Sequence, residues 1–141
     1  GVFDKKLLKV FANALKNLNI KFAWIVNSED GLDEISPYSK TNIVQLKDNE
    51  ISEFVIDPNQ INVNAEKFEN LVGNDAKFNA SKIIEIFKGK DNDFSKAVSL
   101  NAAAGLIVIE KFSDFKESYD NVRKFILSGK TYEHLKLLTD V

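Results

Sequence analysis

A short apolar run followed at once by an acidic loop constrains the fold more than any other stretch of the chain. Residues 22–26, Phe-Ala-Trp-Ile-Val, have the length and composition of a buried strand. The loop behind them, Ser28-Glu29-Asp30-Gly31-Leu32-Asp33-Glu34-Ile35-Ser36, carries four carboxylates. Open α/β sheets bind ligands in the crevice outside the carboxyl ends of their strands. This order predicts an α/β fold with its candidate site in residues 28–36.

Four carboxylates in so short a loop repel one another unless a cation lies among them. Oxygen ligands suit a hard ion such as Mg²⁺, which proteins often hold through one or two carboxylates together with substrate phosphates. A magnesium-phosphate ligand would supply that cation. The alternative, which the spacing alone favours, is a solvated acidic turn in which Gly31 adopts a positive φ.

The chain is predicted to open as α/β and to close as all-helical. Asp4 is expected to cap an amphipathic helix that precedes the strand. Residues 42–46 and 51–56 are predicted to form a β-hairpin, because two short apolar runs flank a polar turn. No internal repeat or domain linker is visible, so a single domain is expected.

The second half of the chain carries several predicted helices. Residues 94–112 are the most apolar of them and are expected to be buried on most sides. Asp75 or one of its neighbours is predicted to cap the helix before this one, and Thr131 to cap the last helix. Asn101 is a polar residue inside the apolar helix, so a hydrogen bond to a neighbouring loop is its expected role. Trp24 is expected to pack in the core.

Missing residue types exclude several kinds of chemistry. The chain has no cysteine, so disulfides, thiolate metal sites and thiol nucleophiles are excluded. The single histidine, His134, lies among polar neighbours and is expected to be a surface residue. The formal net charge of −2 disfavours nucleic-acid and membrane-surface partners. No apolar run has the length of a membrane span, and a cytoplasmic location is expected.

Five motifs occur along the chain in an order typical of one enzyme family. They are Phe3-Asp4-Lys5-Lys6-Leu7-Leu8, Glu29-Asp30-Gly31-Leu32-Asp33-Glu34-Ile35-Ser36, Leu71-Val72-Gly73-Asn74-Asp75-Ala76-Lys77-Phe78-Asn79-Ala80, Leu100-Asn101-Ala102-Ala103-Ala104 and Ser128-Gly129-Lys130. Together, and over the length of the chain, they closely resemble the C-terminal part of the enzymes of the anthranilate phosphoribosyltransferase family. The acidic motif combined with the Leu-Asn-Ala-Ala helix is the most specific part of the resemblance.

The resemblance implies the C-terminal portion of a phosphoribosyltransferase/nucleoside-phosphorylase-like α/β domain, with a strand, a β-hairpin and several flanking helices. Residues 1–141 would be the C-terminal part of this α/β catalytic domain. The glycine-rich loop that binds the donor, and the N-terminal helical domain through which members form homodimers, would lie outside the chain. The absence of Met and the helix almost at the start also suggest part of a longer protein. The chain alone is therefore expected to be inactive.

Members of the family transfer the 5-phosphoribosyl group from phosphoribosyl pyrophosphate to anthranilate, with release of pyrophosphate, in tryptophan biosynthesis. The resemblance places Asp33 and Glu34 at the adjacent acidic residues that hold Mg²⁺ on the donor's pyrophosphate. The metal is needed because pyrophosphate gains negative charge as the glycosidic bond breaks. The resemblance assigns no catalytic residue to this chain.

Two positions depart from the family pattern, and two other functions stay open. Asn74 stands where a second glycine is usual, and Lys40 replaces a glycine ahead of the hairpin. The alternatives are a non-catalytic relative that binds nucleic acid or a protein partner, and a nucleoside phosphorylase. The net charge argues against the nucleic-acid binder. The intact Asp33-Glu34 pair argues against the phosphorylase, since free phosphate as a nucleophile needs no metal bound to pyrophosphate.

Overall fold

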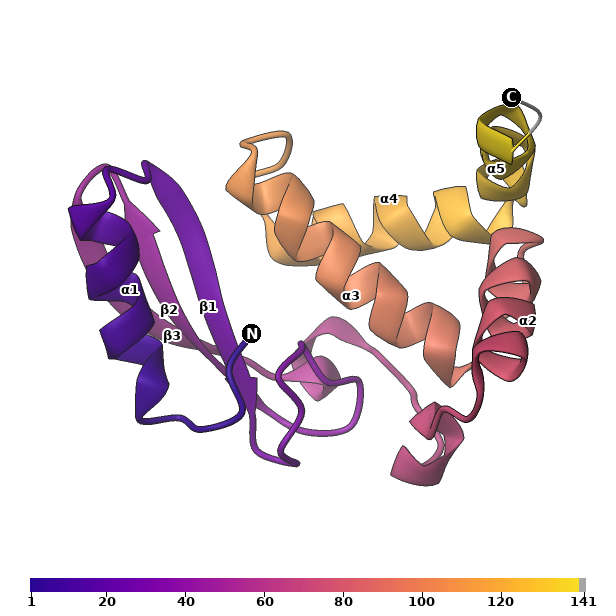
Figure 1. Ribbon diagram of the computed structural model, residues 1–141, viewed down its shortest axis with the longest axis horizontal. Helices are drawn as coiled ribbons and strands as arrows, with labels where there is room; N and C mark the ends of the chain where they lie inside the picture. Colours follow the sequence, from indigo (N-terminus) through magenta and orange to yellow (C-terminus); the bar gives the residue numbers. More distant parts are fainter. Residues whose placement is uncertain (140–141) are drawn as a thin grey trace.

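A three-stranded antiparallel sheet lies at one end of the computed structural model, which describes residues 1–139 (Figure 1). Its strands, in pairing order, are β1 (Phe22–Ser28), β2 (Thr41–Lys47) and β3 (Glu50–Ile56). The hairpin between β2 and β3 turns at Asp48 and Asn49, whose φ angles of 47° and 71° suit a tight two-residue turn. The predicted strand and hairpin are confirmed.

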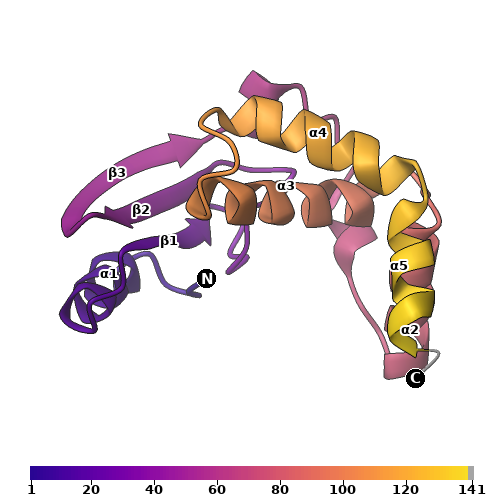
Figure 2. The same cartoon turned by 90° about the horizontal axis from the view of Figure 1, so that it is seen from above.

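Residues 1–139 also contain five α-helices and two short 3₁₀ helices. Their bounds are α1 (Leu7–Asn17), η1 (Pro58–Ile61), η2 (Phe68–Leu71), α2 (Ala76–Phe87), α3 (Asp93–Val108), α4 (Phe115–Leu127) and α5 (Lys130–Thr139). α3 and α4 lie side by side and extend away from the sheet, and α2 and α5 pack together at their far end (Figure 2). None of the helices in these residues is both long and apolar enough to cross a membrane.

Helices cover both faces of the sheet, so β1 and β2 form the middle of three layers (Figure 1). On one face Leu8 of α1 packs in a buried cluster with Ile25 of β1. On the other face Ile43 of β2 shares a larger cluster with Leu100 of α3. Because apolar side chains project from both faces of β1 and β2, these two strands are largely buried, as the apolar run at 22–26 predicted for β1. Most of β3 is exposed.

Of the predicted helix caps, Asp75 is confirmed and two are wrong. The Asp75 carboxylate accepts from the backbone N–H of Phe78 at 2.8 Å. Asp4 lies in a turn before α1, where its side chain accepts from Lys6 N–H at 2.9 Å. Thr131 lies inside the first turn of α5, and its hydroxyl donates to a backbone carbonyl of α2 at 2.9 Å. Both side chains bond other backbone groups: Asp4 a neighbouring N–H, and Thr131 a carbonyl that tertiary packing brings close.

The expectation that α3 is buried on most sides is confirmed. Within α3 only Val98, Ala102 and Gly105 are exposed, and they lie together on one side of the helix. Its other residues are buried or half-buried against neighbours that include β1 and α4. The helix ends at Val108, and Glu110 just beyond it has a φ of 58°, a left-handed conformation that commonly terminates helices.

Candidate functional site

The acidic loop, which we define as residues 28–40, connects the carboxyl end of β1 to β2. Asp30 is bound within the loop, because the hydroxyls of Ser28 and Ser36 and the backbone N–H of Leu32 all donate to its carboxylate. Burial by itself raises the pKa of Asp30, but these hydrogen bonds outweigh burial and lower it. Asp30 therefore shapes the loop.

Asn101 attaches the acidic loop to α3. Its Oδ1 accepts from the backbone N–H of Ile35 at 2.9 Å, and its Nδ2 donates to the carbonyl of Ile35 at 3.2 Å. The same Nδ2 also donates to Ala97 O, one turn earlier in the helix, at 2.9 Å. The polar side chain inside an apolar helix is thus satisfied by a neighbouring loop, as the sequence predicted.

The first residues of the chain pack against the end of β1 and against the acidic loop. Val2 N–H donates to Val26 O at 3.0 Å, and the side chain of Asn27 donates back to Val2 O at 2.9 Å. A Cβ added to Gly1 would clash with the backbone carbonyl of Asp33, so glycine fits this position without a shift of the backbone. The backbone at Asp33 is therefore held by close contact as well as by the hydrogen bonds around it.

Asp33 and Glu34 are adjacent loop carboxylates without a protein partner among the described residues, and Glu29 is a third, separate one. Both residues are exposed, and neither side chain makes a hydrogen bond or ion pair with any residue in 1–139. They lie between the held backbone positions at Leu32 and Ile35. Two adjacent unpaired carboxylates on a fixed backbone fit Mg²⁺, which takes its remaining ligands from phosphate and water.

The structure does not bring all four carboxylates into one cluster. Asp30 is used within the loop, and Glu29 lines a shallow depression with Lys40 and Asp57 beside the hairpin. In the described part of the chain, no three Asp, Glu or His side chains form a group that could hold a metal alone. Gly31 has a φ of 93°, so the positive φ expected for a solvated acidic turn is confirmed. The acidic turn and the Asp33-Glu34 pair coexist in one loop.

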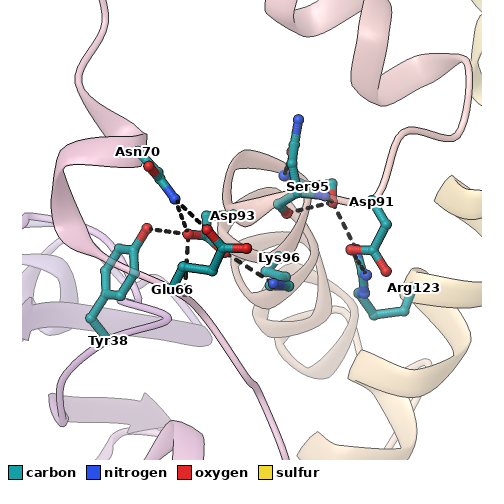
Figure 3. A network of polar contacts seen from close by, with 9 residues as sticks. Tyr38, Glu66, Asn70, Asp91, Asp93, Ser95, Lys96 and Arg123 are labelled. Carbon is teal, nitrogen blue, oxygen red and sulfur yellow. Dashed lines mark hydrogen bonds and ion pairs between the residues drawn. The ribbon is translucent and has the colours of Figure 1, made fainter.

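A buried carboxylate that the sequence analysis missed lies beside the acidic loop (Figure 3). Asp93 is only 4% exposed, and its Oδ2 accepts from Tyr38 Oη at 3.0 Å, Asn70 Nδ2 at 2.8 Å and Glu66 N–H at 3.1 Å. Its Oδ1 pairs with Lys96 Nζ at 3.0 Å. Burial raises the pKa of Asp93, but these contacts outweigh burial and lower it to about 2. An Asp in a helix's first turn ordinarily complements the dipole from the surface, so the sequence carried no signal of this network.

The remaining residues singled out in the sequence behave as packing or surface residues. Trp24 lies between Phe54 and Phe115, with ring centroids 5.1 and 5.9 Å away, and donates to Gln45 Oε1 at 2.8 Å. His134 is exposed on α5. Both predictions are confirmed.

The two departures from the family pattern are accommodated locally. Asn74 does not have a positive φ, and its backbone is held by Asn79, whose Oδ1 accepts from Asn74 N–H at 3.0 Å and whose Nδ2 donates to Asn74 O at 3.1 Å. A second glycine is therefore not required at this turn. Lys40 lies 3.8 Å from Asp57, in a weak ion pair at the edge of the hairpin.

The family model described as "Glycosyl transferase family, a/b domain" matches residues 1–132. The chain belongs to this family. Similar curated members of the glycosyl transferase family include the anthranilate phosphoribosyltransferases of Pelagibacter ubique (strain HTCC1062), 72% identical over 141 residues, and of Azospirillum brasilense, 39% identical over 141 residues. Both alignments cover 100% of this chain, but 43% and 40% of the relatives, so the chain spans about two fifths of their length.

Solved structures show the same fold. Anthranilate phosphoribosyltransferase (TrpD) from Thermus thermophilus superposes with a TM-score of 0.86 at 26% identity, over 96% of this chain and 40% of that one. The Saccharomyces cerevisiae protein in complex with PRPP and Mg superposes with a TM-score of 0.87 at 23% identity, over 99% of this chain and 41% of that one. The predicted α/β fold class and the resemblance to anthranilate phosphoribosyltransferase are confirmed.

Proposed function

We propose that this chain is the C-terminal part of an anthranilate phosphoribosyltransferase. The complete protein would transfer the 5-phosphoribosyl group from phosphoribosyl pyrophosphate (PRPP) to anthranilate and release pyrophosphate. The observation that carries the proposal is the Asp33-Glu34 pair, exposed and unpaired on a fixed loop, in a chain 72% identical to such an enzyme of Pelagibacter ubique. A yeast protein of the same fold has been solved with PRPP and Mg together.

In this proposal Asp33 and Glu34 hold Mg²⁺ on the pyrophosphate of the donor. The bound metal stabilises the charge that the leaving pyrophosphate gains. The chain contributes preorganisation, because Asp30 and Asn101 fix the loop backbone before any ligand arrives. Charge that is already in position does not have to be reorganised during the reaction, so a rigid loop serves this role better than a mobile one.

Other parts of the proposal rest on the resemblance to the family. We expect the complete protein to act in tryptophan biosynthesis in the cytoplasm. We also expect a homodimer whose contacts lie outside residues 1–141.

The double variant Asp33→Asn/Glu34→Gln in the complete protein tests the metal assignment. Turnover, followed by the loss of anthranilate fluorescence on addition of PRPP, is expected to fall by about 10-fold or more at limiting Mg²⁺. Thermal unfolding should be unchanged, because both side chains are exposed and unpaired. Glu29→Gln is the matched control, since it removes an exposed carboxylate of the same loop that lies beside the hairpin.

Unchanged turnover of the double variant at limiting Mg²⁺ would refute the metal assignment. If the unmodified complete protein showed no turnover of anthranilate, the non-catalytic relative or the nucleoside phosphorylase would replace the proposed function. Phosphate-dependent cleavage of a nucleoside would then select the phosphorylase.

A further inference from the structure

The acidic loop is tied to α3 at two places. Asn101 binds the backbone of Ile35, and Asp93 accepts a hydrogen bond from the hydroxyl of Tyr38 at 3.0 Å. Asn101 lies eight positions after Asp93 in the helix, which corresponds to about 12 Å along the helix axis. The half of the loop that follows the Asp33-Glu34 pair is therefore fixed along a rigid element.

Asp93 joins this loop to a third segment of the chain. The oxygen that accepts from Tyr38 also accepts from Glu66 N–H and from the side chain of Asn70 (Figure 3). The ring of Phe68 lies against that of Tyr38, with centroids 6.1 Å apart. Since every donor converges on one buried carboxylate, movement of the acidic loop would break contacts in residues 66–70 and in α3 together.

The protonation states suit a permanent hydrogen bond between the two side chains. With a pKa of about 2, Asp93 is ionised at neutral pH, and hydrogen bonds to an ionised acceptor are stronger than neutral ones. Burial and the hydrogen bond to Asp93 raise the pKa of Tyr38, so its hydroxyl stays a donor. Lys96, on the same turn of α3, balances the charge of Asp93 at 3.0 Å.

We propose that Tyr38 and Asp93 are positioning residues of the magnesium site: their hydrogen bond holds the acidic loop in the conformation in which Asp33 and Glu34 bind the magnesium complex of PRPP. The proposal rests on the proposed function. It predicts that a residue with no contact to the metal or to the donor controls the affinity for both through the shape of the loop.

Tyr38→Phe in the complete protein is the sharpest test, because it removes only the hydroxyl and keeps the ring beside Phe68. Hydrogen exchange of the backbone amides in residues 32–39 is expected to be about 5-fold faster without ligand, the effect of losing one net hydrogen bond. Calorimetric titration with PRPP at fixed Mg²⁺ should show an affinity lower by about the same factor. The KM for anthranilate should not change. Tyr132→Phe is the matched control: it removes the hydroxyl of a tyrosine in α5, whose ring lies against Lys88, just after α2, and Lys136 of α5.

A double-mutant cycle shows whether Tyr38 acts through the acidic pair. In the Asp33→Asn/Glu34→Gln background, Tyr38→Phe should weaken PRPP binding no further, while the faster exchange in residues 32–39 remains. The proposal would be overturned if Tyr38→Phe exchanged its amides and bound PRPP as the wild type does. It would also be overturned if Tyr38→Phe lowered the affinity for PRPP equally in the wild-type protein and in the Asp33→Asn/Glu34→Gln variant. If the pair variant itself bound PRPP and Mg²⁺ as tightly as the wild type, the proposed function would fail first. Asp93→Asn should speed the hydrogen exchange of the backbone amides in residues 66–70 as well. If the Asp93→Asn variant does not fold, the result for Tyr38→Phe still tests the proposal.

Discussion

Two aspartates in the acidic loop, Asp30 and Asp33, carry the same functional group and have opposite roles. Asp30 accepts hydrogen bonds from two serine hydroxyls and a backbone N–H, so its carboxylate is part of the loop's framework. Asp33 accepts none from residues 1–139 and is exposed. An ionised carboxylate gains most from several donors, and one that has them is already satisfied. The environment of each side chain therefore separates the framework residue from the ligand candidate.

At the same scale, the lowered pKa of Asp93 predicts how the stability of the protein depends on pH. Its pKa is lowered from 3.8 to about 2 in the folded protein, so its contribution to stability is complete above about pH 4 and is lost as the pH falls towards 2. In urea unfolding between pH 5 and pH 2, the advantage of the wild type over Asp93→Asn should shrink by about 2 kcal/mol. The exposed carboxylates are the same in both proteins, so their contributions cancel in the difference between the two free energies of unfolding. A difference that stayed constant over this range would contradict the assignment.

At the scale of elements, α3 combines three roles along its length. Its first turn holds Asp93, its middle presents Asn101 to the acidic loop, and Leu100 and Ala103 fill the core between the sheet and α4. Helical periodicity allows this, because successive residues point in different directions and each face meets a different neighbour. A change in the packing of α3 would therefore move the acidic loop as well as the core.

The burial pattern of α3 predicts how its two sides tolerate charge. Ile107, which is 8% exposed, should not tolerate Asp, because an unpaired carboxylate would enter the core. We expect Ile107→Asp to lower the free energy of unfolding by about 3 kcal/mol or more, measured by urea unfolding. Ala102→Asp on the exposed side of the same helix should cost about 1 kcal/mol or less. Equal stability of the two variants would show that the buried side has been assigned wrongly.

At the scale of the whole molecule, the chain forms three layers with a helical extension. It spans about two fifths of the length of the curated relatives named above. The acidic pair lies at one end of the middle layer, at the carboxyl end of β1. In the part of the chain that the structure describes, no set of three Asp, Glu or His side chains could hold a metal without help from a ligand. Metal binding by this chain is thus expected to depend on the donor's phosphates.

This dependence leads to a prediction about activity. With PRPP, Mg²⁺ and anthranilate, the complete protein should consume anthranilate, seen as a loss of its fluorescence, and the isolated 141-residue chain should not. The reason is that the proposed site supplies two metal ligands, and the family resemblance places the donor-binding glycine loop elsewhere. Turnover by the isolated chain would contradict the proposal that further protein is needed.

Much of the architecture could be predicted because its determinants act over a few residues. The apolar run at 22–26 specifies β1, and the polar turn at Asp48 and Asn49 specifies the hairpin. The hydrogen bond of Asn101 to a loop followed from a polar side chain in an apolar helix. The predicted cap at Asp4 is wrong because α1 begins later, at Leu7, and the Asp4 side chain accepts from the nearer N–H of Lys6.

By itself, then, the sequence determined the strand, the hairpin and most of the helices, since periodicity and turn chemistry are local properties of the chain. The motif made Asp33 and Glu34 the predicted metal ligands. Only the tertiary structure decided that Asp30 is used internally while Asp33 and Glu34 stay unpaired. It alone also brought Tyr38 to Asp93, 55 positions along the chain. No local pattern encodes such a contact, because it depends on how β1, the acidic loop and α3 pack against one another.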